Sequence, residues 1–363
     1  MNLKQLKSLS IRKIKGKVRE IRSQLPSEVQ NRITYSKNFT LSLSNYCQNQ
    51  CGYCVYNYKV PKLEGEENRI LIEDAEINNL IQKARKFNCK EALLISGERP
   101  EIFQEVKDEL RRRGCSNYLE FIIGICTNLL EINILPHSNI GLLTFEELRK
   151  LKPFNASMGL MLESTSKELL KKGGVHELSL AKKPKKRIKH IINAGKLKIP
   201  FTTGLLLGIG EDWNDRINDL FLIKEIHHQF GHIQEVIIQN FVSKVGIHYQ
   251  PAYPINIRDI IKTAGIAKII FENDIGVQVA PNLISGFEDE FIDIGVADFG
   301  GISPFTEDFI NPESLWPQIE HLEIICTKKG YILKERLPIY EKYVNLPDFC
   351  SETIKKRIDN IEL

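Results

Sequence analysis

The chain has 363 residues, of which 42% are hydrophobic and 26% are charged, and its formal net charge at pH 7 is +4. The near balance of 50 basic and 46 acidic residues argues against a nucleic-acid-binding stripe or an acidic tail, and no apolar run is long enough to cross a membrane. We therefore expect a soluble, cytoplasmic protein that acts on a small molecule, without a nucleic-acid or membrane partner.

The first 19 residues contain no acid and place Leu, Ile and Val on a helical repeat among lysines and arginines. Transit peptides and membrane-surface helices have this pattern, and so do basic amphipathic helices that dock on a globular domain. We favour the docked helix and assign residues 1–32 to a basic N-terminal extension.

From residue 33 onward, strand patterns alternate with helix patterns, and no hairpin signal separates them. Thr144 and Glu147 suit a capping box before one helix, and Gly231 suits the end of another. The expected helices cover residues 73–88, 101–113 and 215–230. The expected strands cover residues 39–43, 92–96, 119–126, 155–162, 200–207, 235–241 and 277–280, with a further one near residue 296.

Such alternation predicts right-handed β-α-β units and a parallel sheet in the α/β class. A (β/α) TIM-type barrel, full or nearly closed, accounts for seven or eight units, although an open doubly wound sheet has the same periodicity. We assign residues 33–300 to the barrel and residues 301–363 to a C-terminal extension that closes its mouth. In a parallel barrel the chemistry lies at the carboxyl ends of the strands.

Three of the eight cysteines, Cys47, Cys51 and Cys54, crowd into eight residues directly after the first strand. Their spacing, Cys-x-x-x-Cys-x-x-Cys, supplies three thiolates, whereas a saturated 4Fe-4S cluster needs four. One iron would stay open, as a catalytic site requires. A structural zinc site with a remote fourth ligand is the alternative, but zinc sites of this kind usually come as paired Cys-x-x-Cys knuckles. We interpret the other five cysteines as packing residues.

This spacing, with Tyr53 before the last cysteine, resembles the signature of the radical S-adenosylmethionine superfamily. The resemblance implies that the open iron chelates the amino and carboxylate groups of S-adenosylmethionine. It further implies that one electron from the cluster cleaves the sulfonium and releases a 5'-deoxyadenosyl radical.

Further positions resemble the cofactor contacts of that superfamily. Ser96-Gly97-Glu98 is similar to its Gly-Gly-Glu element, with Ser in the first position. Gly208 and Gly210 fall in a run similar to its glycine-rich strand, where missing side chains let the backbone approach an adenine. A glycine-rich strand end on its own is more often a turn.

Two charged residues complete the candidate cofactor site. Glu163 ends an apolar strand, where an unpaired acid is costly, and it would accept hydrogen bonds from the ribose or the ammonium of the cofactor. Arg187 would pair with its carboxylate. Arg187 also stands among lysines, so a solvated basic helix face explains it equally well.

Longer runs narrow the resemblance to the 7,8-didemethyl-8-hydroxy-5-deazariboflavin synthases, CofG subunit type, of coenzyme F420 biosynthesis. The resemblance implies hydrogen abstraction from a 5-amino-5-(4-hydroxybenzyl)-6-(ribitylimino)uracil adduct, followed by ring closure with loss of ammonia, which is carbon-nitrogen lyase chemistry. It also implies that a CofH-type subunit supplies the adduct. The runs are residues 33–38, 156–163, 199–211, 231–241, 298–306, 311–313 and 335–340.

The sequence does not assign the residues that bind the substrate. Polar side chains at predicted strand ends are candidates, and each of them also suits a helix cap or a turn. They are Gln239, Asn240, Asn282 and Asp298. The run 298–306 is the candidate lid. His232 and His248 are candidate proton acceptors, but a lone histidine is more often a core or surface residue, so no catalytic residue is assigned.

Two other functions stay open. Another radical enzyme of the same barrel type, such as a CofH-type partner or a menaquinone-pathway homologue, would share the cysteine loop. A protein of a different class, a non-catalytic zinc or nucleic-acid binder, is suggested only by three cysteines and a basic N-terminus. It would be colourless and would bind nucleic acid in a salt-dependent way.

Overall fold

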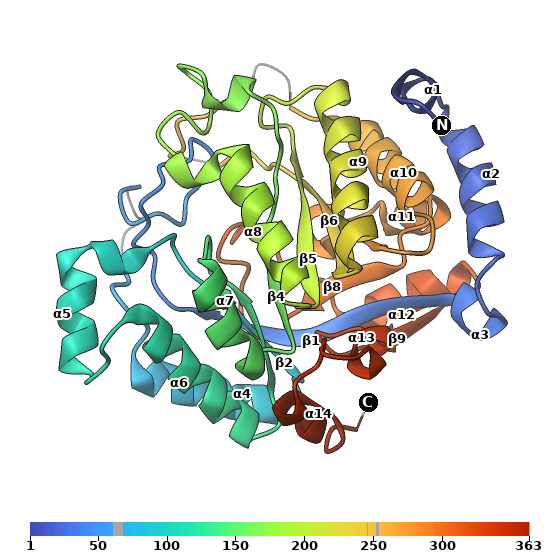
Figure 1. Cartoon of the computed structure of the whole chain (residues 1–363). Coiled ribbons are helices and arrows are strands. Elements are labelled where there is room, and N and C mark those ends of the chain that lie inside the picture. Colours follow the sequence, from blue (N-terminus) through green and yellow to red (C-terminus); the bar gives the residue numbers. More distant parts are fainter. Residues whose placement is uncertain (61–67, 245, 252–253, 363) are drawn as a thin grey trace.

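A closed barrel of eight parallel strands forms the centre of the protein (Figure 1). The computed structural model describes residues 1–60, 68–244, 246–251 and 254–362. The strands follow one another from β2 to β8, then β1, and β1 pairs with β2 to close the ring. They are β1 (Arg32–Ser42), β2 (Glu91–Ile95), β3 (Leu135–Asn139), β4 (Ser157–Gly159), β5 (Phe201–Leu207), β6 (Ile233–Asn240), β7 (Gly276–Gln278) and β8 (Asp298–Ile302). The TIM-type barrel is confirmed, and the open sheet is excluded.

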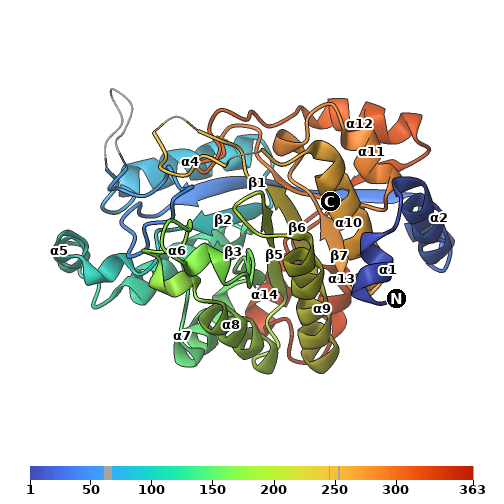
Figure 2. The same ribbon diagram turned by 90° about the horizontal axis from the view of Figure 1, so that it is seen from above.

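Helices surround the barrel on its outer side, as the view from above shows (Figure 2). They are α4 (Asp74–Lys86), α5 (Gln104–Arg112), α6 (Tyr118–Glu131), α7 (Phe145–Leu151), α8 (Pro184–Lys196), α9 (Trp213–Phe230), α10 (Ile257–Phe271), α11 (Glu288–Asp293) and α12 (Ile319–Lys328). One large apolar core, with fully buried Phe39, Phe201 and Phe271, joins strands and helices. Among the helices that the structure describes, none combines the length and apolarity needed to span a bilayer.

The strand predicted at residues 119–126 is wrong, because this segment lies within α6. Asn117 caps the helix by accepting a hydrogen bond from the Glu120 N–H at 3.0 Å. Buried residues then recur at helical spacing, including Phe121, Ile125 and Leu129. The run of isoleucines has high strand propensity, but the cap and the three-four spacing prevail. The barrel strand of this part of the chain is β3, which follows α6 and was not predicted.

Both predicted helix boundaries are confirmed. The Thr144 hydroxyl accepts from the Glu147 N–H at 3.2 Å, and the Glu147 carboxylate accepts from the Thr144 N–H at 2.6 Å, which completes a capping box for α7. Gly231 ends α9 with a φ of 65°, a conformation that glycine adopts without strain.

The N-terminal segment docks on the barrel wall. It forms α1 (Leu3–Lys7), α2 (Ile11–Arg22) and α3 (Ser27–Gln30). Ile14 and Val18 of α2 are buried, and each packs over a glycine, Gly265 of α10 and Gly295. A Cβ at either glycine would lie 2.4 Å from the α2 side chain, so these glycines permit the close approach of α2.

The C-terminal extension divides between the two ends of the barrel, which differs from the expectation that it closes the mouth. Residues 303–318 follow the carboxyl end of β8, where the Thr306 hydroxyl accepts from the Thr40 N–H at 3.1 Å. The chain then forms β9 (Ile332–Glu335), which pairs with β1, followed by α13 (Glu341–Asn345) and α14 (Glu352–Ile358). The Pro338 carbonyl accepts from Ser157 and Gln234, which begin their strands, so this part closes the amino ends.

Two buried carboxylates, Glu235 and Asp298, and two partly buried side chains, Arg336 and Tyr340, form what we call the basal cluster, at the amino ends of the strands. Arg336 donates to both carboxylate oxygens of Asp298, at 2.5 and 2.9 Å, and to Glu235 at 2.7 Å. The Tyr340 hydroxyl lies 3.1 Å from each of the two carboxylates. Asp298 therefore ties the C-terminal segment to the barrel floor. Its predicted roles in substrate binding and in a lid at the mouth are wrong.

Candidate functional site

The cysteine loop begins where β1 ends, at the carboxyl side of the barrel. The Cys47 sulfur accepts a hydrogen bond from the Glu98 N–H at 3.1 Å, which ties the loop to the end of β2. The Cys51 sulfur accepts from the Ser179 hydroxyl at 3.3 Å. The Cys54 N–H donates to the Cys51 carbonyl at 3.1 Å, so the last two cysteines share a tight turn. Hydrogen bonds to cysteine sulfur are one means by which proteins tune iron-sulfur clusters.

The three thiols do not surround a single point. Among the described residues, no three His, Cys, Asp or Glu side chains lie close enough to share one metal ion. A tetrahedral zinc site gathers its ligands around one ion, whereas an iron-sulfur cluster takes each thiolate on a different iron. Cys47, Cys51 and Cys54 supply one thiolate for each of three irons of such a cluster.

Burial makes the thiols of Cys47 and Cys51 poor acids. Burial raises the pKa of Cys51 to about 12, against the attraction of Lys182, and it also raises the pKa of Cys47. A bound metal deprotonates a coordinating thiol outright and so offsets this cost.

Gly97 fits where any other residue would collide with the cysteine loop. A Cβ at this position would lie 2.1 Å from the Tyr46 carbonyl oxygen and 3.0 Å from the Cys47 Cβ. Glu98, next in sequence, accepts from the Leu142 N–H at 2.9 Å and from the Asn49 amide at 3.5 Å. The end of β2 is thus pressed against the loop, with the Glu98 carboxylate held beside it.

Glu163 lies beyond the end of β4 and contacts four polar side chains. We call these five residues the mouth cluster: Glu163, Tyr53, His176, Lys182 and Arg187. The Tyr53 hydroxyl donates to Glu163 at 2.6 Å, His176 Nε2 lies at 3.1 Å and Arg187 Nη2 lies at 3.7 Å. Lys182 forms its shortest ion pair. Glu163 has a φ of +66°, a strained conformation for a non-glycine residue. Strain of this kind persists where the surroundings fix the residue, as they do here.

Electrostatics keeps Glu163 ionised. Burial on its own would raise its pKa, but Lys182 and Arg187 hold that pKa well below the usual range. Burial lowers the pKa of His176, against the opposing pull of Glu163. Around neutral pH the mouth cluster therefore contains one carboxylate and two permanent cations, with an excess of positive charge.

Three members of the mouth cluster, Tyr53, Glu163 and Arg187, are predicted site residues, whereas His176 and Lys182 are not. Lys182 lies in a lysine-rich run, which reads as a solvated helix face. Residues 175–181 form an excursion without regular periodicity, so no pattern places them beside the cysteine loop. Contacts between the two segments do so, including the Ala181 N–H donating to the Asn49 side chain at 3.1 Å.

Gly208 and Gly210 shape the turn that leaves β5. Their φ values are +90° and +115°, where other residues are strained. Glu211 folds back and accepts from the Gly208 N–H at 2.8 Å and from the Ile209 N–H at 2.9 Å. Arg216 holds Glu211 through two bonds, at 2.7 and 2.8 Å. The turn is therefore built around a fixed carboxylate, and its glycines serve backbone geometry.

The other candidates divide between the two ends of the barrel. Asn240 ends β6 at the mouth, and its Oδ1 is buried without a hydrogen-bond partner among the described residues. Asn282 instead ties down the segment after β8, by donating to Asp308 at 3.0 Å. His232 precedes β6 at the opposite end, where its Nε2 donates to the Ile191 carbonyl at 2.9 Å, and burial lowers its pKa to about 3. His232 is therefore excluded as a mouth residue, whereas His248 is exposed.

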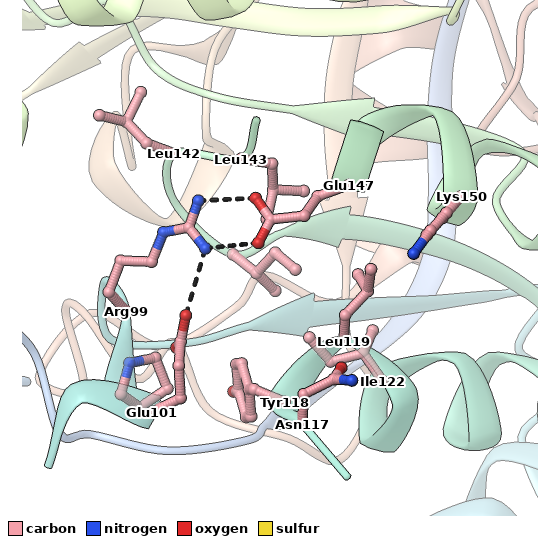
Figure 3. Close-up of a pocket in the computed structure, with 12 residues that line it drawn as sticks. Arg99, Glu101, Asn117, Tyr118, Leu119, Ile122, Leu142, Leu143, Glu147 and Lys150 are labelled. Carbon is pink, nitrogen blue, oxygen red and sulfur yellow. Dashed lines mark hydrogen bonds and ion pairs between the residues drawn. The ribbon is translucent and has the colours of Figure 1, made fainter. Parts of the chain in front are cut away.

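A cavity of about 230 Å³ lies beside Glu98, on the outer side of the barrel between α6 and α7 (Figure 3). Its charged wall is Arg99, which donates to both carboxylate oxygens of Glu147 at 2.7 Å and to Glu101 at 3.2 Å. Because Arg99 directly follows Glu98, this ion pair fixes the turn at the end of β2.

Comparison with known sequences gives one consistent result. The family model of the radical SAM superfamily matches residues 41–223. A 7,8-didemethyl-8-hydroxy-5-deazariboflavin synthase from Methanococcus maripaludis is 46% identical over 86% of this chain and 92% of its own length. The synthase of the same name from Methanocaldococcus jannaschii is 42% identical over 97% of this chain and 95% of its own.

Solved structures agree at the level of the fold. The methylornithine synthase PylB has a TM-score of 0.69 at 18% identity, covering 92% of this chain and 93% of its own. The hydrogenase maturase HydG has a TM-score of 0.71 at 16% identity, covering 91% of this chain and 70% of its own. These identities are low, so the likeness concerns the barrel alone.

Proposed function

The chain belongs to the 7,8-didemethyl-8-hydroxy-5-deazariboflavin synthases of the radical SAM superfamily, and from this premise we propose how the residues at its mouth serve the reaction. The enzyme uses a 4Fe-4S cluster and S-adenosylmethionine to form the deazaflavin chromophore of coenzyme F420. The observation that carries the proposal is the convergence of the cysteine loop, the end of β2 and the mouth cluster at one end of the barrel.

Cys47, Cys51 and Cys54 hold the cluster. Three thiolates leave one iron free for the cofactor, and the hydrogen bonds from Glu98 and Ser179 steady two of the sulfurs. When bound, the reduced cluster and S-adenosylmethionine together supply a carbon-centred radical that removes one hydrogen atom from the substrate.

The mouth cluster and the end of β2 bind S-adenosylmethionine by charge. The cofactor carries a carboxylate, an ammonium and a sulfonium. Lys182 and Arg187 exceed Glu163 by one positive charge, which suits the cofactor carboxylate. The carboxylates of Glu163 and Glu98 suit the ammonium or the ribose hydroxyls, and Tyr53 fixes Glu163 in place.

Glycines bring backbone close to the cofactor. Gly97 lets β2 lie against the cysteine loop, and Gly208 and Gly210 turn the end of β5 without side chains. Backbone N–H and C=O groups at such strand ends reach an adenine that a side chain would exclude.

The substrate is the uracil adduct that carries the hydroxybenzyl and ribityl groups, and ring closure releases ammonia, so the reaction is that of a carbon-nitrogen lyase. Asn240 supports the placement of a polar substrate at the mouth, because its unpartnered buried oxygen needs an N–H donor, which a uracil provides. A CofH-type subunit supplies this adduct, and the two enzymes work in sequence.

An anaerobic assay tests the proposal. Reconstituted protein receives S-adenosylmethionine, dithionite and the synthetic adduct, and 5'-deoxyadenosine and deazaflavin fluorescence are read together. The two products should rise in step. Deoxyadenosine without fluorescence would reject the substrate, and fully loaded protein that yields neither product would reject the proposed site. A reaction without the adduct is the control.

A further inference from the structure

A segment beside the cysteine loop has a larger net positive charge than the whole protein. Residues 167–189 contain nine Lys and Arg and two Glu, a net charge of +7, whereas the whole chain is +4. The rest of the molecule is therefore net negative. Lys182 pairs with Glu163, and Lys171 pairs with Glu168. Within the described part of the chain, the other lysines of this segment make no ion pair; they are Lys167, Lys172, Lys183, Lys185, Lys186 and Lys189.

These lysines do not stabilise the helix that carries them. Lys185 and Lys186 occupy the first turn of α8, and that turn has no acid. Positive charge at a helix N-terminus opposes the helix dipole, which favours acids there. The charge arrangement at the start of α8 is therefore unfavourable for the helix itself.

Two exposed leucines lie in the same segment. Leu178 is 61% exposed and Leu180 is 62% exposed, and they flank Ser179, whose hydroxyl donates to the Cys51 sulfur. Single exposed apolar residues are common on protein surfaces. Two of them rimmed by unpaired lysines match an interface with an apolar centre and a charged rim.

The segment is bound directly to the cysteine loop. The Gln50 N–H donates to the Leu178 carbonyl at 3.2 Å, and the Gly52 N–H donates to the Val175 carbonyl at 2.8 Å. Together with the hydrogen bond from Ser179 to the Cys51 sulfur, these contacts place both leucines next to residues that touch the cysteine loop. A protein docked on them would come close to the cluster.

We propose that Leu178, Leu180 and the lysines at the start of α8 form the docking surface for an acidic one-electron carrier protein, such as a flavodoxin, that reduces the cluster. This inference rests on the proposed function, which places the cluster at Cys51. The carrier loses one electron and the cluster gains one, and no atom is transferred. Opposite charge steers the encounter, and small interfaces suit transient redox partners.

The test reverses charge at three lysines outside the proposed cofactor site. The variant combines Lys183→Glu, Lys185→Glu and Lys186→Glu, and acids at this helix start should leave α8 stable. The matched control combines Arg12→Glu, Lys13→Glu and Arg19→Glu, three exposed residues of α2, with the same change in net charge.

Binding is the first readout and does not depend on activity. Cluster-loaded protein is titrated with purified oxidised acidic flavodoxin at low and high salt. Wild type and control should bind, with affinity that falls as salt rises, and the lysine variant should bind at least tenfold more weakly. Equal binding by all three proteins would overturn the proposal. So would flavodoxin failing to bind while a DNA duplex or a CofH-type subunit binds and loses affinity in the variant.

Electron delivery is the second readout. With reduced flavodoxin, deoxyadenosine formation should fall at least tenfold in the lysine variant, and with dithionite it should match wild type. An equal loss with dithionite would overturn the proposal, because the lysines would then act on the cofactor site. Flavodoxin-driven cofactor cleavage without deazaflavin would reject the proposed substrate and leave the docking surface standing.

Discussion

The two ends of the barrel each hold a buried charged cluster, and the clusters differ in charge balance. The mouth cluster has one carboxylate, Glu163, against two permanent cations. The basal cluster has two carboxylates, Glu235 and Asp298, against one guanidinium, Arg336. The mouth cluster therefore has one positive charge in excess, which the carboxylate of the proposed cofactor would balance. The basal cluster can balance itself by keeping one proton.

The two clusters also differ in backbone conformation. Glu163 is strained at positive φ and draws its partners from loops and a helix end. The basal cluster joins strands β6 and β8 to the closing segment through direct hydrogen bonds. Strain concentrates where function requires a fixed side chain, whereas the floor of a barrel serves stability. We infer that the mouth cluster binds the cofactor and that the basal cluster holds the fold.

The largest effect should follow from removing a sulfur at the mouth. Cys51→Ala should abolish cluster assembly and product formation, because two thiolates do not hold the cluster. Iron content and the visible spectrum measure the first, and deoxyadenosine measures the second. Cys115→Ser, away from the loop, should change neither. A brown, active Cys51 variant would show that the cysteine loop does not hold the cluster.

The next effect should appear at the base and should concern stability. Arg336→Met leaves Glu235 and Asp298 buried without their cation, and loss of one partner of a buried ion pair costs about 3–5 kcal/mol. Urea unfolding of the cluster-free protein measures this loss. Arg111→Met, at an exposed ion pair with Asp108, should leave the unfolding midpoint nearly unchanged. A stable Arg336 variant would contradict the structural role of the basal cluster.

A smaller effect should appear as a pH dependence near the base. Burial raises the pKa of Glu91 from 4.5 to about 7, opposed by a hydrogen bond from Ser36 and by Arg336. A carboxyl with a raised pKa contributes stability that is fully present below pH 4.5 and is lost as pH rises through about 7. The loss is on the order of 3 kcal/mol.

Glu91→Gln should therefore flatten the fall in unfolding free energy between pH 5 and pH 8. Urea unfolding of both proteins at several pH values measures this slope, with exposed Glu20→Gln as the control. Parallel curves for wild type and the Glu91 variant would show that Glu91 does not keep its proton on folding.

Sequence patterns predicted what depends on neighbours along the chain. The alternation of strands and helices, the capping box at Thr144 and the helix end at Gly231 are local, and all of them are present. The prediction for the α6 segment was wrong because isoleucine suits both a strand and a buried helix. The prediction gave more weight to the isoleucines than to the three-four spacing of the apolar residues.

Contacts between distant segments could not be predicted. Asp298 follows a strand pattern like other candidates, and nothing local reveals that Arg336 holds it at the floor. Lys182 resembles its solvated neighbours, and only the path of residues 175–181 along the cysteine loop brings it to Glu163. Motif spacing located the cysteines and glycines, because their function depends on nearby backbone.

The binding of S-adenosylmethionine to a matched pair of variants tests the central contrast most directly. Glu163→Gln alters the mouth cluster, and Glu235→Gln makes the same chemical change in the basal cluster. Affinity is measured by equilibrium dialysis on cluster-loaded protein. We predict that Glu163→Gln weakens binding at least tenfold with the cluster intact, while Glu235→Gln leaves affinity unchanged. Equal affinity for both variants and wild type would contradict the assignment of the cofactor to the mouth cluster.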